Sequence, residues 1–479
     1  MLSLALLLQA SALPALAGGI PAAVVDVIAL VDSGDFIAAE AVVADALQRP
    51  GLSPEERSEL EFQRERMRRI LIDFPHDEAD VHASLGALIP DLREVHIARW
   101  EHAGMLEMMV IDGRKRYFER AVSNLFRLSA DATALRATPP RYVDGPMETP
   151  NEHHRAVRKA ALSSGNSSVM PQRVRVTQTL TVDADAVPGG EIVRAWIPFP
   201  RAIPGHQEDI RLVASEPATR VVAPEATPQR TVYLEQAAIA SLPTRFSITY
   251  ELVIRAQYHA VDPEKVVPAS ITPELAGHLG ERAPHIVHTD AIRAFSHKVV
   301  GGEKNPYRIA QKLFTAVDAI PWAGAREYST ISNIGDYALR AGHADCGQQT
   351  LLLMTLLRLN GIPARWQSGM VFSDDTYDNL HDWGQVYLAP YGWVPMDVTF
   401  GRFDSAPDIE WFYLGGLDAY RIVFNDDYGT PLHPRKQHFR SETVDSQRGE
   451  AEWRGGNLYF DQWDYAFTAQ VLPERSGAE

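Results

Sequence analysis

The chain has 479 residues, of which 45% are hydrophobic and 23% are charged, a composition typical of folded globular proteins. Its length predicts about three domains rather than one. Its 46 basic residues against 62 acidic ones give a net charge of −16, which disfavours nucleic acid and anionic lipid as partners. The single cysteine, Cys346, excludes an internal disulfide and multi-cysteine metal sites, so any thiol chemistry must take place there.

The first residues predict a cleavable secretory signal over residues 1–17. An apolar run precedes the small residues Ala15 and Ala17, although no Lys or Arg comes before Arg49. The run is too short to span a bilayer, and no later segment offers the roughly 20 uninterrupted apolar residues that a membrane helix needs. We expect a periplasmic or secreted protein without an integral membrane segment. The alternative is that this run is the first helix of a cytoplasmic protein.

Residues 18–128 predict a helical domain, because apolar residues recur at spacings of three and four. Residues Ser53–Glu56 supply an N-cap, a first-turn proline and a capping-box glutamate, so a helix should begin there. The Asp112-Gly113 pair between two extended runs predicts a β-hairpin. No catalytic motif falls in this domain.

Residues 129–170 are expected to be a linker, since they are rich in Ala, Thr, Pro, Ser and Asn and show no sustained periodicity. Its His153-His154 pair is expected to be solvated, because no cluster of carboxylates or cysteines accompanies it. Residues 171–265 predict a small antiparallel β-sandwich of short strands separated by Pro and Gly. Apolar residues alternate at Val174, Val176, Leu180 and Val182, and at Phe246, Ile248, Tyr250, Leu252 and Ile254.

Cysteine, histidine, aspartate and tryptophan are concentrated in one stretch of the C-terminal half. Asp345 is a predicted helix N-cap with Gln348 as its capping-box partner, and the helix should end at Asn360-Gly361. Cys346 then stands in the first turn, where unpaired N–H groups and the helix dipole stabilise a thiolate. A backbone N–H at the same place can donate to the oxyanion that forms when sulfur attacks a carbonyl. This position suits a nucleophile.

A predicted hairpin follows, with His381 on its first strand and Asp397 on its second. Because neighbouring strands bring side chains together, Asp397 can orient the imidazole while the other ring nitrogen takes the thiol proton of Cys346. Taken singly, the cysteine can be a small buried hydrophobe, the histidine a strand-end residue and the aspartate a turn residue. Together they predict a catalytic triad.

At these residues the sequence resembles the transglutaminase-like superfamily, through the blocks DCGQQ, GIPARWQSG, HDWGQVYL and GWVPMDVTFG between Pro306 and Gly401. The resemblance implies a papain-like core with Cys346 as nucleophile, His381 as general acid and base, and Asp397 as orienting carboxylate. The segment VRAWIPFPR also resembles the module that precedes this core in bacterial members.

The expected fold is therefore multidomain α+β: a helical N-terminal domain, a small antiparallel β-sandwich and a transglutaminase-like α+β core with additional C-terminal strands. The aromatic-rich stretches beyond Trp411 are expected to pack as strands on the core, which we place at residues 266–479.

Aromatic residues are candidates for supporting roles. In this superfamily or in papain an upstream Trp or Gln usually supplies a second oxyanion donor, and Trp322 and Tyr328 are the nearest upstream candidates, although either can equally be a core residue. Trp383 lies two residues beyond His381 and so on the same strand face, where it shields the His–Asp pair, lines the acyl cleft or packs in the core. We assign Trp322 and Trp383 to substrate or oxyanion binding.

The expected activity is that of an exported thiol-dependent amide or peptide hydrolase acting through an acyl thioester on Cys346. One alternative is a protein-glutamine transglutaminase that transfers the acyl group to an amine, and another is a catalytically silent cell-envelope scaffold. The expected partner is a protein or peptide substrate, and the oligomeric state stays open.

No cofactor or metal is expected, because the sequence lacks HExxH, phosphate-binding and dinucleotide-binding motifs. The pairs Asp374-Asp375 and Asp426-Asp427 lack the ligand spacing of a calcium loop.

Overall fold

The structure is a computed structural model that describes residues 22–142, 144–373 and 378–473. The chain divides into two compact units, one running to Arg68 and including Val110–Arg114, and the other holding the rest. The predicted signal peptide and the Asp374-Asp375 pair lie outside the described residues. Within the described part, no helix is both long and apolar enough to cross a membrane.

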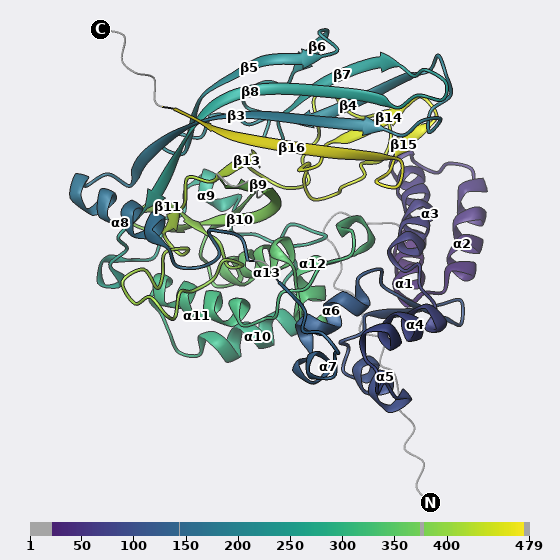
Figure 1. Cartoon of the computed structure of the whole chain (residues 1–479), viewed down its shortest axis with the longest axis horizontal. Helices are drawn as coiled ribbons and strands as arrows, with labels where there is room; N and C mark the ends of the chain where they lie inside the picture. Colours follow the sequence, from purple (N-terminus) through teal and green to yellow (C-terminus); the bar gives the residue numbers. More distant parts are fainter. Residues whose placement is uncertain (1–21, 143, 374–377, 474–479) are drawn as a thin grey trace, which may run out of the picture. The chain divides into compact units, whose positions relative to one another are not determined.

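The first unit is built from α1 (Ala22–Ser33), α2 (Phe36–Gln48) and most of α3 (Pro54–Asp73). Gly34, with φ of 85°, turns the chain between α1 and α2, which pack against each other (Figure 1). The predicted start of α3 is confirmed, because the Ser53 hydroxyl accepts from the Glu56 N–H at 3.1 Å and the Glu56 carboxylate from the Ser53 N–H at 2.9 Å.

Short helices and one hairpin follow. The helices are α4 (Glu78–Leu88), α5 (Glu94–His102), α6 (Ala121–Leu128) and α7 (Ala130–Ala134), and the hairpin joins β1 (Met108–Ile111) to β2 (Arg114–Tyr117). The predicted turn is confirmed, with positive φ at both Asp112 and Gly113.

The stretch expected to be a linker contains helices. Besides α7 it holds α8 (Glu152–Ser164), which begins with a capping box between Asn151 and His154 and ends at Gly165 with φ of 69°. His154, Val157 and Ala161 lie on its buried side. The absence of a long apolar repeat hid this helix in the sequence, since a histidine occupies one of its core positions. His154 is therefore a buried residue, not a solvated one.

The β-sandwich consists of two antiparallel sheets in the second unit. One has the order β12-β8-β3-β16, with β5 also paired to β8, and the other has the order β15-β14-β4-β7-β6. Its first strands are β3 (Ser168–Val182), β4 (Ile192–Pro198), β5 (Gln207–Glu216), β6 (Arg220–Val222), β7 (Thr231–Ala237) and β8 (Thr244–Tyr258). The alternating residues predicted for β3 and β8 are all buried in the core between the sheets.

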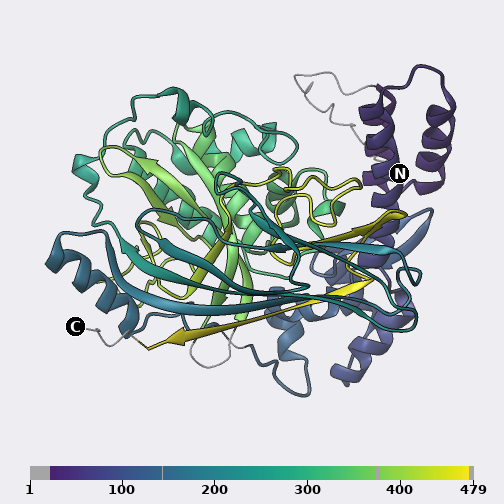
Figure 2. The ribbon, with the colours of Figure 1, turned by 90° about the horizontal axis from the view of Figure 1, so that it is seen from above.

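The C-terminal strands differ from the expectation, because most of them complete the sandwich. β14 (Glu450–Trp453) pairs with β4, β15 (Gly456–Leu458) with β14, and β16 (Trp463–Leu472) runs beside β3 along ten residues (Figures 1 and 2). Only β13 (Arg421–Asn425) joins the sheet that carries His381, while β12 (Gly416–Leu417) pairs with β8. A strand that extends a sheet pairs its backbone hydrogen bonds with those of the edge strand. An alternating pattern predicts that a segment is a strand, but it does not say which sheet edge the strand will join.

The core that positions the site is a four-stranded sheet packed on helices. The sheet has the order β11-β10-β9-β13, with β9 (Ala364–Phe372), β10 (Asp378–Leu388) and β11 (Gly392–Met396). Its helices are α9 (Pro273–Ala276), α10 (Asp290–Val300), α11 (Pro306–Asp318), α12 (Ile334–Ala341) and α13 (Cys346–Leu359). α13 is buried on nearly all sides against α11, α12 and β10. The predicted β10–β11 hairpin is confirmed.

Candidate active site

The start of α13 places Cys346 where the sequence predicts it. The Asp345 carboxylate accepts from the Gln348 N–H at 3.0 Å, and the Gln348 amide oxygen accepts from the Asp345 N–H at 3.2 Å. This capping box confirms the predicted helix start. Gln349 ties the same turn to the loop after β11, because its Oε1 accepts from the Thr399 hydroxyl at 2.7 Å. Cys346 is thereby fixed beside the loop that follows Asp397.

The predicted His–Asp pair is present where that loop begins. His381 donates from Nε2 to Oδ2 of Asp397 at 2.7 Å, and both side chains are buried. The other carboxylate oxygen, Oδ1, accepts from the backbone N–H groups of Thr399 and Phe400, each at 3.2 Å. Phe400 also stacks on the imidazole with ring centroids 4.4 Å apart. This leaves Nδ1 of His381 as the nitrogen that can take a proton from a thiol.

A cation also binds this carboxylate oxygen. Arg421, from β13, donates from Nη1 to Oδ2 of Asp397 at 2.7 Å, and all of the groups involved are fully buried. Burial alone would raise the pKa of Asp397, but the charges of His381 and Arg421 hold it below its ordinary value. Asp397 is therefore kept ionised.

A chain of buried hydrogen bonds continues from Arg421 to α8. Arg421 donates to Oδ2 of Asp418 at 2.5 Å, and the Tyr413 hydroxyl lies 3.0 Å from the same oxygen. Nε2 of His154 lies 3.0 Å from the Tyr413 hydroxyl, and its Nδ1 accepts from the Asn151 N–H. Burial lowers the pKa of His154 to about 4, so this histidine is neutral and donates to the tyrosine.

The sulfur has a different partner from the one predicted. Sγ of Cys346 donates to Oδ2 of Asp382 at 3.2 Å, and among the described residues no hydrogen bond joins it to His381. Asp382 follows His381 directly on β10, so the two side chains leave opposite faces of the strand. The structure therefore brings together the first turn of α13, the Asp397 loop and the start of β10, but directs the thiol to Asp382.

The predicted stabilisation of a thiolate at the helix start is wrong for this conformation. Burial raises the pKa of the Cys346 thiol well above its ordinary value, and the charge of Asp345 and the hydrogen bond to Asp382 raise it further. Burial and the two neighbouring carboxyls therefore oppose ionisation of the sulfur at this helix start. The resting cysteine is a thiol.

The two upstream aromatic candidates lie in different surroundings. The Pro321–Ala323 segment runs beside Ala344, whose N–H donates to the Pro321 carbonyl at 3.1 Å. Trp322 is 38% exposed, and its ring packs against the guanidinium of Arg127 at 4.6 Å. Trp322 thus stays a prediction for the second oxyanion donor.

Tyr328 is buried, and its hydroxyl donates to Oδ1 of Asp345 at 2.7 Å. The same hydroxyl lies 3.4 Å from Oδ2 of Asp382, the carboxylate oxygen that holds the sulfur. Tyr328 therefore contacts both carboxyls that lie beside Cys346 and helps to hold them in place.

Trp383 packs behind the histidine rather than lining a cleft. Its indole is fully buried, stacks at 5.9 Å on His381 and donates its N–H to Oε1 of Gln367 at 3.1 Å. Because that N–H already has an acceptor, Trp383 does not supply an oxyanion donor, which corrects its assignment to substrate or oxyanion binding. Its place is that of a shield for the His–Asp pair.

Several residues of the site were not identified from the sequence. Arg421, Asp418 and Tyr413 come from a stretch read only as aromatic-rich strands. Asp382 carried a signal in the sequence, since a carboxylate in the middle of an apolar strand is costly to bury unless something pairs with it. Among the described residues, no group of three or more His, Cys, Asp or Glu side chains is arranged to hold a metal ion.

Residues 293–398, which include Cys346, His381 and Asp397, match the model of the transglutaminase-like superfamily. This part of the chain is a transglutaminase-like domain, and its chemistry is that of cysteine-dependent hydrolases and transferases in general. No curated protein matches the chain.

Two solved structures resemble the fold. One, from Cytophaga hutchinsonii and provisionally described as a cysteine protease, is 13% identical, with 65% of this chain and 94% of that chain covered and a TM-score of 0.43. The periplasmic domain of TgpA from Pseudomonas aeruginosa is 14% identical, with 56% and 97% covered and a TM-score of 0.26. Because both TM-scores are below 0.5, the family assignment rests on the sequence match and not on these structures.

Proposed function

We propose that the chain is an exported cysteine hydrolase that cleaves amide or peptide bonds through an acyl thioester on Cys346. The observation that carries this proposal is the buried His381–Asp397 hydrogen bond of 2.7 Å, beside a helix whose first residue is the only cysteine. The match of residues 293–398 to the transglutaminase-like superfamily supports the same chemistry.

In the proposed reaction, Sγ of Cys346 leaves Asp382 and meets Nδ1 of His381, which requires the start of β10 or of α13 to shift, because the two partners leave opposite faces of the strand. The imidazole takes the proton as sulfur bonds to the acyl carbon, and it returns the proton to the leaving amine as the C–N bond breaks. Water then attacks the thioester, which releases the acid and restores the thiol. Asp397, held ionised by Arg421, stabilises the imidazolium and fixes its ring.

The oxyanion of each step would form at the start of α13. The N–H groups of Cys346 and Gly347 lie in the first turn, where a helix has no acceptor of its own for them. Trp322 is the proposed second donor, since its backbone runs beside Ala344 and its side chain is partly exposed.

The acyl acceptor separates this proposal from a transglutaminase. Incubation with a glutaminyl peptide and a labelled primary amine should release ammonia or the free acid without fixing the label to the peptide. Incorporation of the label would instead show acyl transfer to an amine. Cys346→Ser is the control, and it should lose both reactions.

A catalytically silent scaffold is the third possibility, and the thiol bonded to Asp382 rather than to His381 is the observation that favours it. Trapping with an acyl probe decides this point, because a silent core leaves Cys346 unmodified.

Export is proposed from the apolar run and small residues at the amino terminus. N-terminal sequencing of material from the cell envelope tests it, since an intact Met1 would contradict cleavage.

A further inference from the structure

The carboxyl of Asp382, which accepts the thiol of Cys346, has a second oxygen that is not used by this contact. Oδ2 of Asp382 takes the Cys346 thiol at 3.2 Å and faces the Tyr328 hydroxyl at 3.4 Å. Oδ1 is buried and has no hydrogen-bond donor among the described residues. A buried carboxylate oxygen without a donor costs a large desolvation energy, so a group must compensate for it.

That group is a second carboxyl. Asp445 lies beside Asp382, close enough for its negative charge to raise the pKa of Asp382, and two such carboxyl groups can bond to each other only if one of them is protonated. Ser368, directly opposite Asp382 on β9, donates its hydroxyl to Oδ2 of Asp445 at 2.6 Å. This donor stabilises a negative charge on Asp445, which leaves the shared proton on Asp382.

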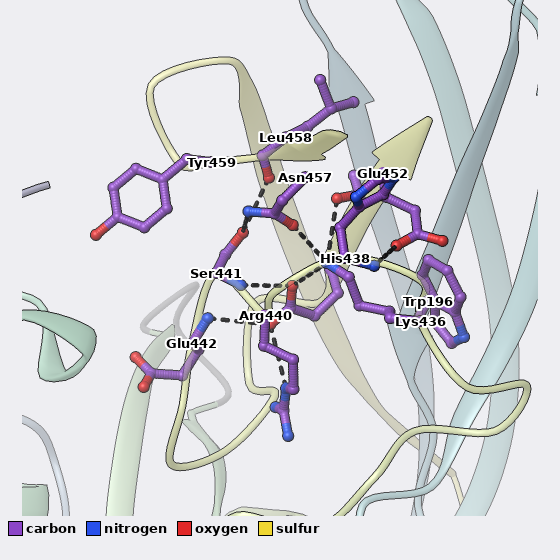
Figure 3. Close-up of polar contacts among 12 residues, drawn as sticks. Trp196, Lys436, His438, Arg440, Ser441, Glu442, Glu452, Asn457, Leu458 and Tyr459 are labelled. Atoms are coloured by element: carbon purple, nitrogen blue, oxygen red, sulfur yellow. Dashed lines mark hydrogen bonds and ion pairs between the residues drawn. The ribbon is translucent and has the colours of Figure 1, made fainter. Parts of the chain in front are cut away.

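The segment that carries Asp445 is fixed in place. Residues 426–449 form no helix or strand, but Glu450, at the start of β14, accepts from Lys436 Nζ at 2.7 Å and from the Ser441 N–H at 2.8 Å. Figure 3 shows Ser441 bonded in turn to the Leu458 carbonyl and to Asn457. The same segment donates from Gln447 to the His381 carbonyl at 2.8 Å, so it is attached to the strand of the site.

The charges around Asp382 and Asp445 favour the state in which the two carboxyls share one proton over the state in which both are ionised. Burial raises the pKa of Asp382 well above its ordinary value, and the charge of Asp445 adds to this. Burial, followed by the charges of Asp445 and Glu327, raises the pKa of Glu442 to about 8. The other ionisable groups that act on the pair are Asp345, Cys346, Tyr328, Arg440 and Arg448.

We propose that Asp382 is a catalytic residue that shares one proton with Asp445, holds Sγ of Cys346 as a neutral acid and spares the forming thiolate an adjacent negative charge. This inference rests on the proposed function. Asp445 is its positioning residue. When the thiol proton passes to His381, the negative charge of the pair stays on Asp445 and not on Asp382, the carboxyl that contacts the sulfur.

Alkylation by iodoacetamide tests this directly, because Cys346 is the only thiol in the chain and each added group is counted by intact mass. The rate is measured from pH 5 to pH 10 for the full chain, Asp382→Asn and Asp445→Asn. Asp382→Asn should keep the alkylation rate at pH 7 within about threefold, because an amide replaces a group that is already neutral. Asp445→Asn should move the profile up by about one pH unit or more and slow alkylation about tenfold at pH 7, because the charge then moves to Asp382.

The opposite pattern would overturn the proposal. If Asp382→Asn speeds alkylation about tenfold while Asp445→Asn changes nothing, Asp382 carries the charge itself and no proton is shared. Equal profiles for all three proteins would show that the carboxyls do not act on the sulfur. Ser368→Ala is the second variant should Asp445→Asn not fold, and it should move the profile in the same direction by a smaller amount.

Alkylation needs no substrate, so it separates this inference from the proposed function. The expected rate pattern in a chain that forms no acyl-enzyme would refute the hydrolase and retain the shared proton. Acyl-enzyme formation together with equal alkylation profiles would support the hydrolase and refute the shared proton. Circular dichroism of each variant confirms that the fold is kept.

Discussion

The two faces of β10 are built with opposite electrostatics, although their central residues, His381 and Asp382, are neighbours in sequence. On the histidine face, Arg421 pairs with the carboxylates of Asp418 and Asp397, and Asp397 also accepts from His381. On the sulfur face, Asp345 and Asp382 lie beside Cys346, and Asp445 acts on Asp382. The histidine face stabilises ionised groups by pairing opposite charges, whereas the carboxyls of the sulfur face are stabilised by binding protons.

This difference teaches how the strand separates two tasks. Full pairing fixes the imidazole and keeps its carboxylate charged, which is what an acid–base catalyst needs before substrate arrives. The carboxyl-rich face keeps the cysteine as a thiol until it meets its base. Under this account, Cys346 is activated when its thiol exchanges the hydrogen bond to Asp382 for one to His381. A permanent ion pair between a thiolate and an imidazolium is not needed.

The largest expected effect comes from removing the cation of the histidine face. Arg421→Met leaves Asp397 and Asp418 buried with an uncompensated charge, which should cost about 3–5 kcal/mol of the free energy of unfolding. Urea unfolding followed by fluorescence measures it. Adding Asp418→Asn to the same chain should recover part of the loss.

The matched control is the exposed Arg454–Glu191 pair, in which the arginine side chain is 74% exposed. Arg454→Met should leave the free energy of unfolding nearly unchanged, because solvent screens an exposed ion pair. If the two arginine variants destabilise the chain equally, the histidine face is not a charge-paired core.

On the sulfur face, Gly347 leaves room for the carboxyls. A Cβ at this position would lie 2.1 Å from the Tyr328 hydroxyl and 2.7 Å from Oδ2 of Asp382. Gly347→Ala should therefore cost about 1–3 kcal/mol in stability, as overpacked cores do, and displace the partner of the thiol. Thermal melting and the alkylation rate of Cys346 check the two effects. An alanine variant that matches the natural chain in both would show that these contacts are loose.

The two faces should also differ in the sign of their pH dependence. Burial raises the pKa of Asp345 to about 6, so the folded chain binds more protons than the unfolded chain between about pH 4 and pH 6, and stability from this group is lost as the pH rises. The charge of Arg421 outweighs burial and holds the pKa of Asp418 below its ordinary value, so stability from that group is lost as the pH falls.

Asparagine variants separate these signs. Asp345→Asn, which still caps the helix, should gain about 1–2 kcal/mol over the natural chain between pH 4 and pH 8. Asp418→Asn should be less stable than the natural chain by an amount that is constant between about pH 4 and pH 8 and shrinks only below about pH 4, where the natural chain loses the contribution of this group. Urea unfolding at both pH values measures the differences, and two variants that change in the same direction would remove the electrostatic distinction.

Local signals predicted the elements better than their partners. The capping residues around Cys346, the hairpin carrying His381 and Asp397, and the alternation in β3 and β8 each depend on a few neighbouring residues, and the structure has all of them. The joining of β16 to β3 and the docking of His154 on Tyr413 depend on residues more than 250 positions apart, which no local period encodes. The domain boundaries stay predictions.

The site shows the same limit. The His381–Asp397 pair and the helix start at Cys346 were readable, but the partner of the thiol was not, because alternation along β10 places Asp382 without saying which face meets α13. The charge network behind Asp397 was equally hidden, since Arg421 contributes through the sheet order β10-β9-β13.

The smallest expected effect concerns the shield of the His–Asp pair. Trp383→Phe keeps an aromatic ring against His381 but loses the hydrogen bond to Gln367, which should cost about 1 kcal/mol. Thermal melting measures this loss, and catalysis should change little. A large loss of activity with an unchanged melting temperature would instead restore Trp383 to the substrate site.

The most direct measurement is intact-mass detection of an acyl group on Cys346 after brief incubation with a library of peptide amides and activated thioesters. The proposed mechanism predicts one acyl group per chain, released by hydroxylamine, absent from Cys346→Ser and strongly reduced in His381→Asn. Turnover of the same substrates by Cys346→Ser at the natural rate would contradict it.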